Sequence, residues 1–169
     1  QQLAAEGTPF VGLLYCGLII TDAGIKVIEF NARFGDPETQ VLLARMTSPL
    51  SDYLYASATG SLADLSAPEF TDDVGVCVVL ASEGYPSDTV TGREILGLET
   101  VAEEMPGVRV IHAATEIDEQ GRTIATGGRV LSVVAVEPTF ERARQAAYDA
   151  LAGITLSGGH FRSDIAANV

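Results

Sequence analysis

The N-terminal part of the chain alternates between apolar runs and short polar turns. Residues 11–20 are nearly all apolar, which is typical of a strand covered on both faces. Residues 21–24, Thr-Asp-Ala-Gly, have the composition of a turn, and a second apolar run follows over residues 25–30. The pattern predicts a β-hairpin with a buried core.

Two helices are predicted after this hairpin. Asp36 and Pro37 have the residue types of an N-cap and a first helical position, and apolar residues recur after them at helical spacing. A second helix is predicted over residues 50–59 and is expected to end at Gly60. The first residues of the chain resemble the end of a helix closed by Gly7, so we expect the sequence to be a piece of a longer protein.

The composition changes over residues 61–73, which are rich in Ser, Ala, Pro, Asp and Glu and indicate a boundary. Beyond it, apolar runs separated by Gly-containing turns predict strands over residues 74–81, 108–113, 123–126 and 129–137. Pro138 and Thr139 then open an amphipathic helix, whose buried face is expected to hold Phe140, Ala143, Ala147 and Leu151 and which ends at Gly153. Residues 154–164 are expected to return as a short strand that carries Arg162 and Asp164. The fold class predicted from these elements is α+β.

Charge and composition exclude several classes of function. The formal charge is −13, from 23 acidic and 10 basic residues, which would repel a polyanion and argues against nucleic-acid binding. No apolar run reaches the roughly 18 residues that a membrane-spanning helix needs, so we expect neither a membrane partner nor a location outside the cytoplasm. Cys16 and Cys77 lie in apolar runs and are interpreted as reduced core thiols.

The densest group of polar residues lies where the second strand of the hairpin ends. Glu29 and Asn31 are two residues apart, so a strand presents both on one face, and their oxygens suit a hard divalent cation. Arg33 follows and could bind a transferring phosphate through both guanidinium nitrogens. The pattern suggests metal and phosphate chemistry, but Glu29 and Asn31 could equally be two solvated residues at a strand end.

Four other polar residues are candidates whose roles stay open at this level. Asp36 could be a helix cap alone or a cap that also binds a ligand. Glu38 lies in the first turn of the predicted helix, where it complements the helix dipole. His112 is interpreted as a strand histidine rather than a base, and Arg129 as the partner of a carboxylate rather than of an anion.

Several motifs resemble the phosphoribosylamine–glycine ligase family, also called glycinamide ribonucleotide synthetases, which belongs to the ATP-grasp ligases. The resemblance spans the whole chain. The most specific motif is the run Glu29-Phe30-Asn31-Ala32-Arg33-Phe34-Gly35-Asp36-Pro37-Glu38-Thr39-Gln40. It is accompanied by Gly12-Leu13-Leu14-Tyr15-Cys16-Gly17-Leu18, Gly84-Tyr85-Pro86, His112-Ala113-Ala114-Thr115, Gly127-Gly128-Arg129-Val130-Leu131 and Arg162-Ser163-Asp164-Ile165.

The resemblance implies a C–N bond-forming ligase of de novo purine biosynthesis. In this family ATP converts the glycine carboxylate to glycyl phosphate, and the amine of 5-phosphoribosylamine then displaces phosphate. By resemblance, Glu29 and Asn31 hold Mg²⁺ or Mn²⁺, and Ile28 packs near the adenine of ATP. No carboxylate is present in residues 11–20, so the metal would depend on this pair, on phosphates and on water.

Three further roles follow from the resemblance alone. Arg33 would be catalytic and stabilise charge on the transferring phosphoryl group. Asp36 and Glu38 would line the pocket for glycine and phosphoribosylamine.

The resemblance also assigns the two parts of the chain. Residues 1–65 would be the C-terminal end of an ATP-grasp core, a β-hairpin plus helices, and residues 72–169 a small β-rich domain with one amphipathic helix. The lysines and glycine-rich flap that hold ATP in such enzymes would lie in upstream domains, so we expect the isolated chain to be inactive. The alternative is a non-catalytic binding or structural module derived from an ATP-grasp protein.

Overall fold

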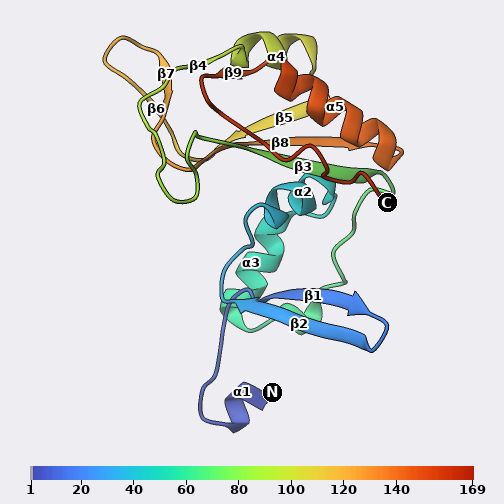
Figure 1. Cartoon of the computed structure of the whole chain (residues 1–169). Helices are drawn as coiled ribbons and strands as arrows, with labels where there is room; N and C mark the ends of the chain where they lie inside the picture. Colours follow the sequence, from blue (N-terminus) through green and yellow to red (C-terminus); the bar gives the residue numbers. More distant parts are fainter. Residues whose placement is uncertain (1) are drawn as a thin grey trace. The chain divides into compact units, whose positions relative to one another are not determined.

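The computed structural model describes residues 2–169, which divide into two compact units. The first unit comprises Gln1–Thr39 and Met46–Phe70, and the second comprises Gln40–Arg45 and Thr71–Val169. Figure 1 shows the elements of both units. The mixture of helices and strands confirms the predicted α+β class.

The first unit is built around a two-stranded antiparallel hairpin (Figure 1). Its elements are α1 (Gln2–Ala5), β1 (Tyr15–Thr21), β2 (Gly24–Asn31), the start of α2 (Glu38–Arg45), α3 (Leu50–Thr59) and the 3₁₀ helix η1 (Leu62–Asp64). Helix α3 has the predicted bounds, and it ends because Gly60 adopts a left-handed conformation with φ of 77°. Helix α2 begins at Glu38, one residue later than predicted, so Pro37 precedes the helix instead of taking its first position.

The pairing of β1 with β2 contains a β-bulge. Thr21 pairs with Gly24 and Leu18 with Val27, but Gly17 pairs with Glu29, so that Ile28 is an extra residue in β2. Beyond the bulge, Tyr15 pairs with Asn31. A bulge increases the local twist and changes the direction of the neighbouring side chains.

The prediction of a buried hairpin core is wrong for this chain. The apolar side chains of both strands are exposed, with relative accessibilities of 52% for Leu18, 85% for Ile20 and 61% for Phe30. Cys16 is exposed as well and is therefore not a core thiol, whereas Cys77 is partly buried. Cys16 pairs with Phe30, Leu18 with Val27 and Ile20 with Ile25, so these apolar residues share one face of the hairpin, and that face is exposed in the structure of residues 2–169.

The second unit is organised by a three-stranded antiparallel sheet in the order β3-β8-β5. Helix α5 packs on this sheet, and Figure 1 shows it running along the three strands. The elements of this unit are β3 (Val74–Ala81), β4 (Ile95–Leu96), α4 (Leu98–Glu104), β5 (Val108–His112), β6 (Thr115–Ile117), β7 (Thr123–Ala125), β8 (Arg129–Glu137), α5 (Phe140–Ala152) and β9 (Thr155–Leu156).

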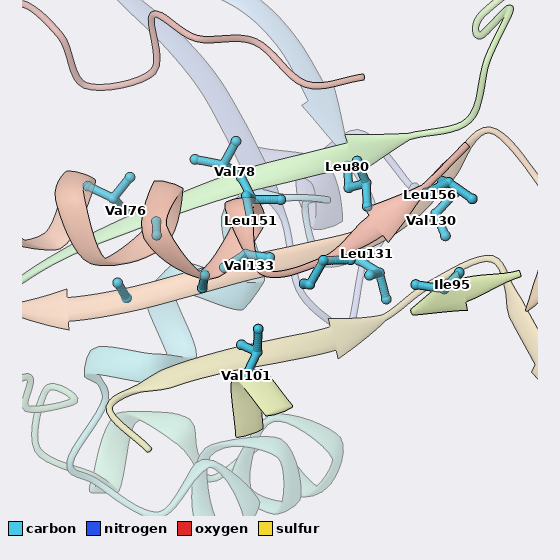
Figure 2. Packing of buried hydrophobic residues seen from close by; sticks show 14 of the residues in the cluster. Val76, Val78, Leu80, Ile95, Val101, Val130, Leu131, Val133, Leu151 and Leu156 are labelled. Atoms are coloured by element: carbon cyan, nitrogen blue, oxygen red, sulfur yellow. The ribbon is translucent and has the colours of Figure 1, made fainter. Parts of the chain in front are cut away.

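The hydrophobic core of the chain lies between α5 and this sheet (Figure 2). Ala143, Ala147 and Ala150 are fully buried on one face of α5, and such small side chains let the helix approach the strands closely. Phe140, which was expected on this face, is 42% exposed, because it begins the helix at its edge. The core extends to Ile95 of β4 and Leu156 of β9, which pair with each other.

The tail after α5 differs from its prediction in extent. Strand β9 covers only Thr155–Leu156, and His160 forms an isolated bridge to Ala81. Arg162 and Asp164 therefore lie outside any strand and form an ion pair at 2.7 Å.

An ion pair between Asp118 and Arg122 closes the turn between β6 and β7 and changes the pKa of Asp118. Asp118 accepts hydrogen bonds from the Arg122 side chain (Nε, 2.8 Å) and from the backbone N–H groups of Arg122 and Gln120. These contacts, with the Arg122 side chain as the largest contribution, lower the pKa of Asp118 below its usual value. The carboxylate thus stabilises the turn at pH values above the unfolded pKa, and this contribution is lost as pH falls through the folded pKa.

We expect Arg122→Gln to raise the pKa of Asp118 part of the way back, because the backbone donors remain. The measurement is a titration of the Asp118 carboxyl carbon by NMR. Arg109→Gln serves as the control, since Arg109 is an exposed residue of β5. An Asp118 pKa that is the same in all three proteins would show that the backbone donors alone lower it.

Candidate functional site

The polar residues at the end of β2 share one face of the hairpin. Paired residues of antiparallel strands point to the same side, so Tyr15, Asn31 and Glu29 lie on one face. Glu29 pairs with Gly17, where an added Cβ would lie 3.1 Å from the Glu29 Cγ. The absence of a side chain at Gly17 therefore leaves room for Glu29 to lie across β1.

Glu29 and Asn31 share one face of the strand, as predicted, and their side chains are also in direct contact. The Asn31 amide Nδ2 donates a hydrogen bond of 2.8 Å to the Glu29 carboxylate oxygen Oε1. Glu29 is exposed and Asn31 half-buried, so both side-chain oxygens can be reached by a ligand.

This pair fits a hard divalent cation. A carboxylate and an amide oxygen on one face are the donors that Mg²⁺ accepts, and Mg²⁺ commonly takes one or two protein ligands together with phosphate and water oxygens. A rotation of the Asn31 amide about its terminal bond would bring its oxygen to the side of Glu29. Within residues 2–169 no group of three His, Cys, Asp or Glu side chains forms a metal site.

Glu38 lies close to the same group of residues. A Cβ added at Gly35 would lie 2.5 Å from Glu38 Oε2, so the carboxylate lies directly over the buried Gly35 backbone. Burial of Tyr15, then the charge of Glu38 and its hydrogen bond with the hydroxyl, and finally the charge of Glu29, raise the pKa of Tyr15 above its usual value. Tyr15, Glu29, Asn31 and Glu38 thus form one cluster, which we call the hairpin site.

Three other predicted residues lie at the end of the hairpin and before helix α2. The Arg33 guanidinium is exposed and donates a hydrogen bond of 2.7 Å to the backbone carbonyl of Phe34. Ile28 is the extra residue of the bulge and is 66% exposed. Asp36 is half-buried just before helix α2.

His112 and Arg129 belong to the second unit. His112 ends β5, and its Nδ1 lies 2.9 Å from the Thr115 hydroxyl. Arg129 is the first residue of β8, is half-buried and pairs in register with Ala81.

Tyr15 is the member of the hairpin site that the sequence analysis missed. In the sequence it lies within the apolar run of residues 11–20, where no neighbouring polar residue marks it as a site residue. Its position opposite Asn31 depends on the bulge at Ile28. No residue type in strands β1 and β2 predicts this bulge.

No helix within residues 2–169 has both the length and the apolar composition that crossing a bilayer requires.

Two protein-family models match this chain, one in its N-terminal part and one in its C-terminal part. The family described as phosphoribosylglycinamide synthetase, C domain, matches residues 75–168. The family described as phosphoribosylglycinamide synthetase, ATP-grasp (A) domain, matches residues 1–39, which contain all four residues of the hairpin site.

Two similar proteins carry the same name. A phosphoribosylamine–glycine ligase of Leifsonia xyli is 60% identical over 168 residues, and one of Streptomyces coelicolor is 51% identical over 168 residues. Each alignment covers 99% of this chain and 40% of the relative. The chain therefore spans about 40% of the length of these relatives.

A solved structure agrees with these sequence matches. The crystal structure of phosphoribosylamine–glycine ligase from Thermotoga maritima superposes with a TM-score of 0.79 at 29% identity. The matched region comprises 96% of this chain and 39% of the Thermotoga maritima chain. These matches confirm the resemblance seen in the sequence motifs, and the chain belongs to the phosphoribosylglycinamide synthetase family.

Proposed function

We propose that the chain forms part of an ATP-dependent ligase that joins glycine to 5-phosphoribosylamine. In the proposed reaction the glycine carboxylate attacks the γ-phosphorus of ATP, which gives glycyl phosphate and ADP. The amine of phosphoribosylamine then attacks the acyl carbon, and phosphate leaves. The product is glycinamide ribonucleotide, and the step belongs to de novo purine biosynthesis in the cytoplasm.

The observation that carries this proposal is the contact between Glu29 and Asn31. The 2.8 Å hydrogen bond holds two oxygen-bearing side chains together on one face of a strand. They lie within the 1–39 segment that matches the ATP-grasp domain of the family. The identity of 60% to the Leifsonia relative extends over almost the whole chain and supports the same assignment.

Glu29 and Asn31 are the proposed ligands of Mg²⁺ or Mn²⁺. When bound, the cation supplies charge neutralisation at the ATP phosphates. The bound phosphates and water would complete its coordination, since this pair supplies two donors.

Arg33 is the proposed catalytic cation. Its guanidinium is exposed at the end of the hairpin, and its hydrogen bond to the Phe34 carbonyl would be exchanged for two bonds to the transferring phosphoryl group. This exchange costs little because the Phe34 bond is exposed to water.

The remaining proposed roles concern the organic substrates. Asp36 and Glu38 would line the pocket for glycine and phosphoribosylamine, and Ile28 would pack near the adenine. We also propose that residues 1–65 are the C-terminal part of the ATP-grasp domain and that residues 72–169 form the C-terminal domain. The upstream domains that complete the enzyme would bind most of the ATP molecule.

A chimera tests this function. We define the chimera as the Leifsonia xyli ligase in which this chain replaces the 168 matching residues. We expect it to release ADP only when glycine and phosphoribosylamine are both present, and to form glycinamide ribonucleotide in equal amount. The isolated chain is expected to show no turnover, because it spans 40% of the length of that relative.

Two outcomes would contradict the proposal. A folded chimera without ligase activity would favour a non-catalytic module derived from an ATP-grasp protein. Turnover by the isolated chain would show that the upstream domains are not needed. The unmodified Leifsonia ligase, assayed in parallel, provides the reference rate.

A further inference from the structure

Helix α2 depends on other parts of the chain for its position. It has eight residues, Glu38–Arg45, and none of them is fully buried. An isolated helix of this length is marginal in water, so packing against neighbouring elements must hold it in place. Glu38 and Thr39 belong to the first unit, whereas Gln40–Arg45 belong to the second. The contacts of the second part of the helix therefore help to decide where the first part is held.

One of these contacts is made with strand β3 at Gly75. A Cβ added at Gly75 would lie 2.5 Å from Val41 Cγ2 and 3.3 Å from Arg45 Cδ. The first distance is far shorter than a van der Waals contact between carbon atoms, so no side chain fits between β3 and the helix at this point. Gly75 lies within β3, and its φ is outside the left-handed region. Close approach of the helix, and not the backbone conformation, is thus the reason for a glycine here.

Arg45 holds the last turn of the helix. Its Nη2 donates a partly buried hydrogen bond of 2.9 Å to the Thr71 carbonyl oxygen. Its own carbonyl oxygen accepts a 2.8 Å hydrogen bond from the Thr71 backbone N–H. These two bonds fix the end of α2 along its axis, while the contact of Val41 with Gly75 sets the distance of the helix from β3.

Glu38 shares a face of α2 with the two residues that make these contacts. Val41 and Arg45 follow Glu38 by three and seven positions, and residues at these spacings lie on one side of an α-helix. A change in the rotation or height of the helix at Gly75 therefore changes the position of the Glu38 carboxylate.

The first turn of α2 leaves little room for such a change. The Glu38 carboxylate lies over the backbone of Gly35, where an added Cβ would be 2.5 Å from Oε2. The Thr39 backbone N–H also donates a 3.2 Å hydrogen bond to the Gly35 carbonyl oxygen. The helix is thus closely fitted at both of its ends.

We propose that Gly75 is a positioning residue of the ligase, because its missing side chain lets β3 hold α2 where Glu38 completes the hairpin site. This inference rests on the proposed function and adds to it a residue that acts through a helix instead of by contact with a substrate. Glu29 and Asn31 are placed by the β1–β2 ladder. The position of α2 should therefore affect the contribution of Glu38 and leave the metal pair unchanged.

The test is Gly75→Ala in the chimera. We expect the KM for glycine or for phosphoribosylamine to rise about tenfold, because a displacement of about 1 Å that starts far from the chemistry can cost about 100-fold. The Mg²⁺ concentration for half-maximal rate is expected to stay within about twofold, since Glu29 and Asn31 are unchanged. A variant that is only less stable would contain less active enzyme and show a lower kcat at the same KM.

Val41→Ala provides a rescue. It removes the Cγ2 atom that the new Cβ would meet, so the double variant with Gly75→Ala should have KM values within about threefold of the unmodified chimera. Gly107→Ala is the matched control in the second unit. No heavy atom lies within 4 Å of its added Cβ and its φ is not left-handed, so this variant should leave every constant unchanged.

Hydrogen–deuterium exchange of the Thr39 amide in the chimera gives a measurement that does not depend on activity. We expect faster exchange in Gly75→Ala, because the first turn of α2 moves away from the Gly35 carbonyl, and a return to the original rate in the double variant. Arg45→Met decides the question if Gly75→Ala fails to fold. It removes the side-chain bond to the Thr71 carbonyl, leaves β3 intact and should give the same selective rise in KM.

The failure of this inference and the failure of the proposed function can be distinguished. In an active chimera, unchanged KM values for both substrates in Gly75→Ala, or a shifted Mg²⁺ requirement, would overturn the inference and leave the ligase function intact. A double variant no better than Gly75→Ala would show that Gly75 does not act through α2. A chimera that is inactive with all native residues contradicts the proposed function, whereas the exchange of Thr39 still tests how α2 is held.

Discussion

Glu29→Gln in the chimera is expected to lower the rate of ATP-dependent glycine coupling by about 100-fold or more, since even outer partners of metal ligands change affinity by 10–100-fold. Glutamine has nearly the same shape as glutamate and can still accept the 2.8 Å hydrogen bond from Asn31. The substitution therefore removes the negative charge and little else. The measurement is the rate against Mg²⁺ concentration at saturating substrates.

Asp22→Asn is the control for this experiment. Asp22 is an exposed carboxylate at the turn of the same hairpin, at the end opposite the hairpin site. We expect this substitution to change neither the rate nor the Mg²⁺ dependence. If Glu29→Gln behaves like Asp22→Asn, Glu29 is not a ligand of the cation.

Gly97→Ala is expected to lower the free energy of unfolding by about 3 kcal/mol, the sum of left-handed backbone strain and a displaced neighbour. Gly97 begins helix α4 with φ of 86° and ψ of 0°. An added Cβ would overlap the carbonyl oxygen of Gly153, the residue that ends helix α5. Two backbone segments cross here at a distance that only glycine permits.

Gly92→Ala separates the two contributions. Gly92 has nearly the same φ, 81°, but no heavy atom lies within 4 Å of its added Cβ. Its free energy of unfolding should fall only by the cost of left-handed backbone strain, about 1–2 kcal/mol. Urea unfolding of the chain and of both variants measures the difference, and equal losses at the two glycines would show that the Gly153 contact relaxes freely.

The long elements of the fold could be predicted from local patterns. Strands β3 and β8 and helix α3 have the predicted bounds, because continuous apolar runs and a terminal glycine define them in the sequence. Helix α4 was missed, since it spans Leu98–Glu104 and buries only Val101. Two-residue strands such as β4 are too short to show any periodicity.

The exposure of the hairpin was mispredicted for a physical reason. An apolar run shows that a strand is suited to burial. It does not show which other element of the protein packs against that strand. The sequence therefore predicted the hairpin and its turn, but β1 begins at Tyr15 instead of residue 11, and the predicted burial of the hairpin is wrong for Leu18, Ile20 and Phe30.

The hairpin site was predictable in part. Two residues of separation were enough to place Glu29 and Asn31 together, and the structure joins them by a hydrogen bond. Tyr15 could not be found in this way. Counting from the turn without a bulge would pair Tyr15 with Phe30, and the polar residues would then point to the other face.

The same bulge gives the hairpin a competing arrangement. A slip by one residue would make a fully regular ladder, in which Ile28 and Phe30 take the places of Glu29 and Asn31 opposite Gly17 and Tyr15. The apolar side chains of both strands are exposed within residues 2–169, so their burial favours neither ladder. Only the bulged ladder places Tyr15 on the face of Glu29 and Asn31, so a chain that folds into the regular ladder does not form the hairpin site.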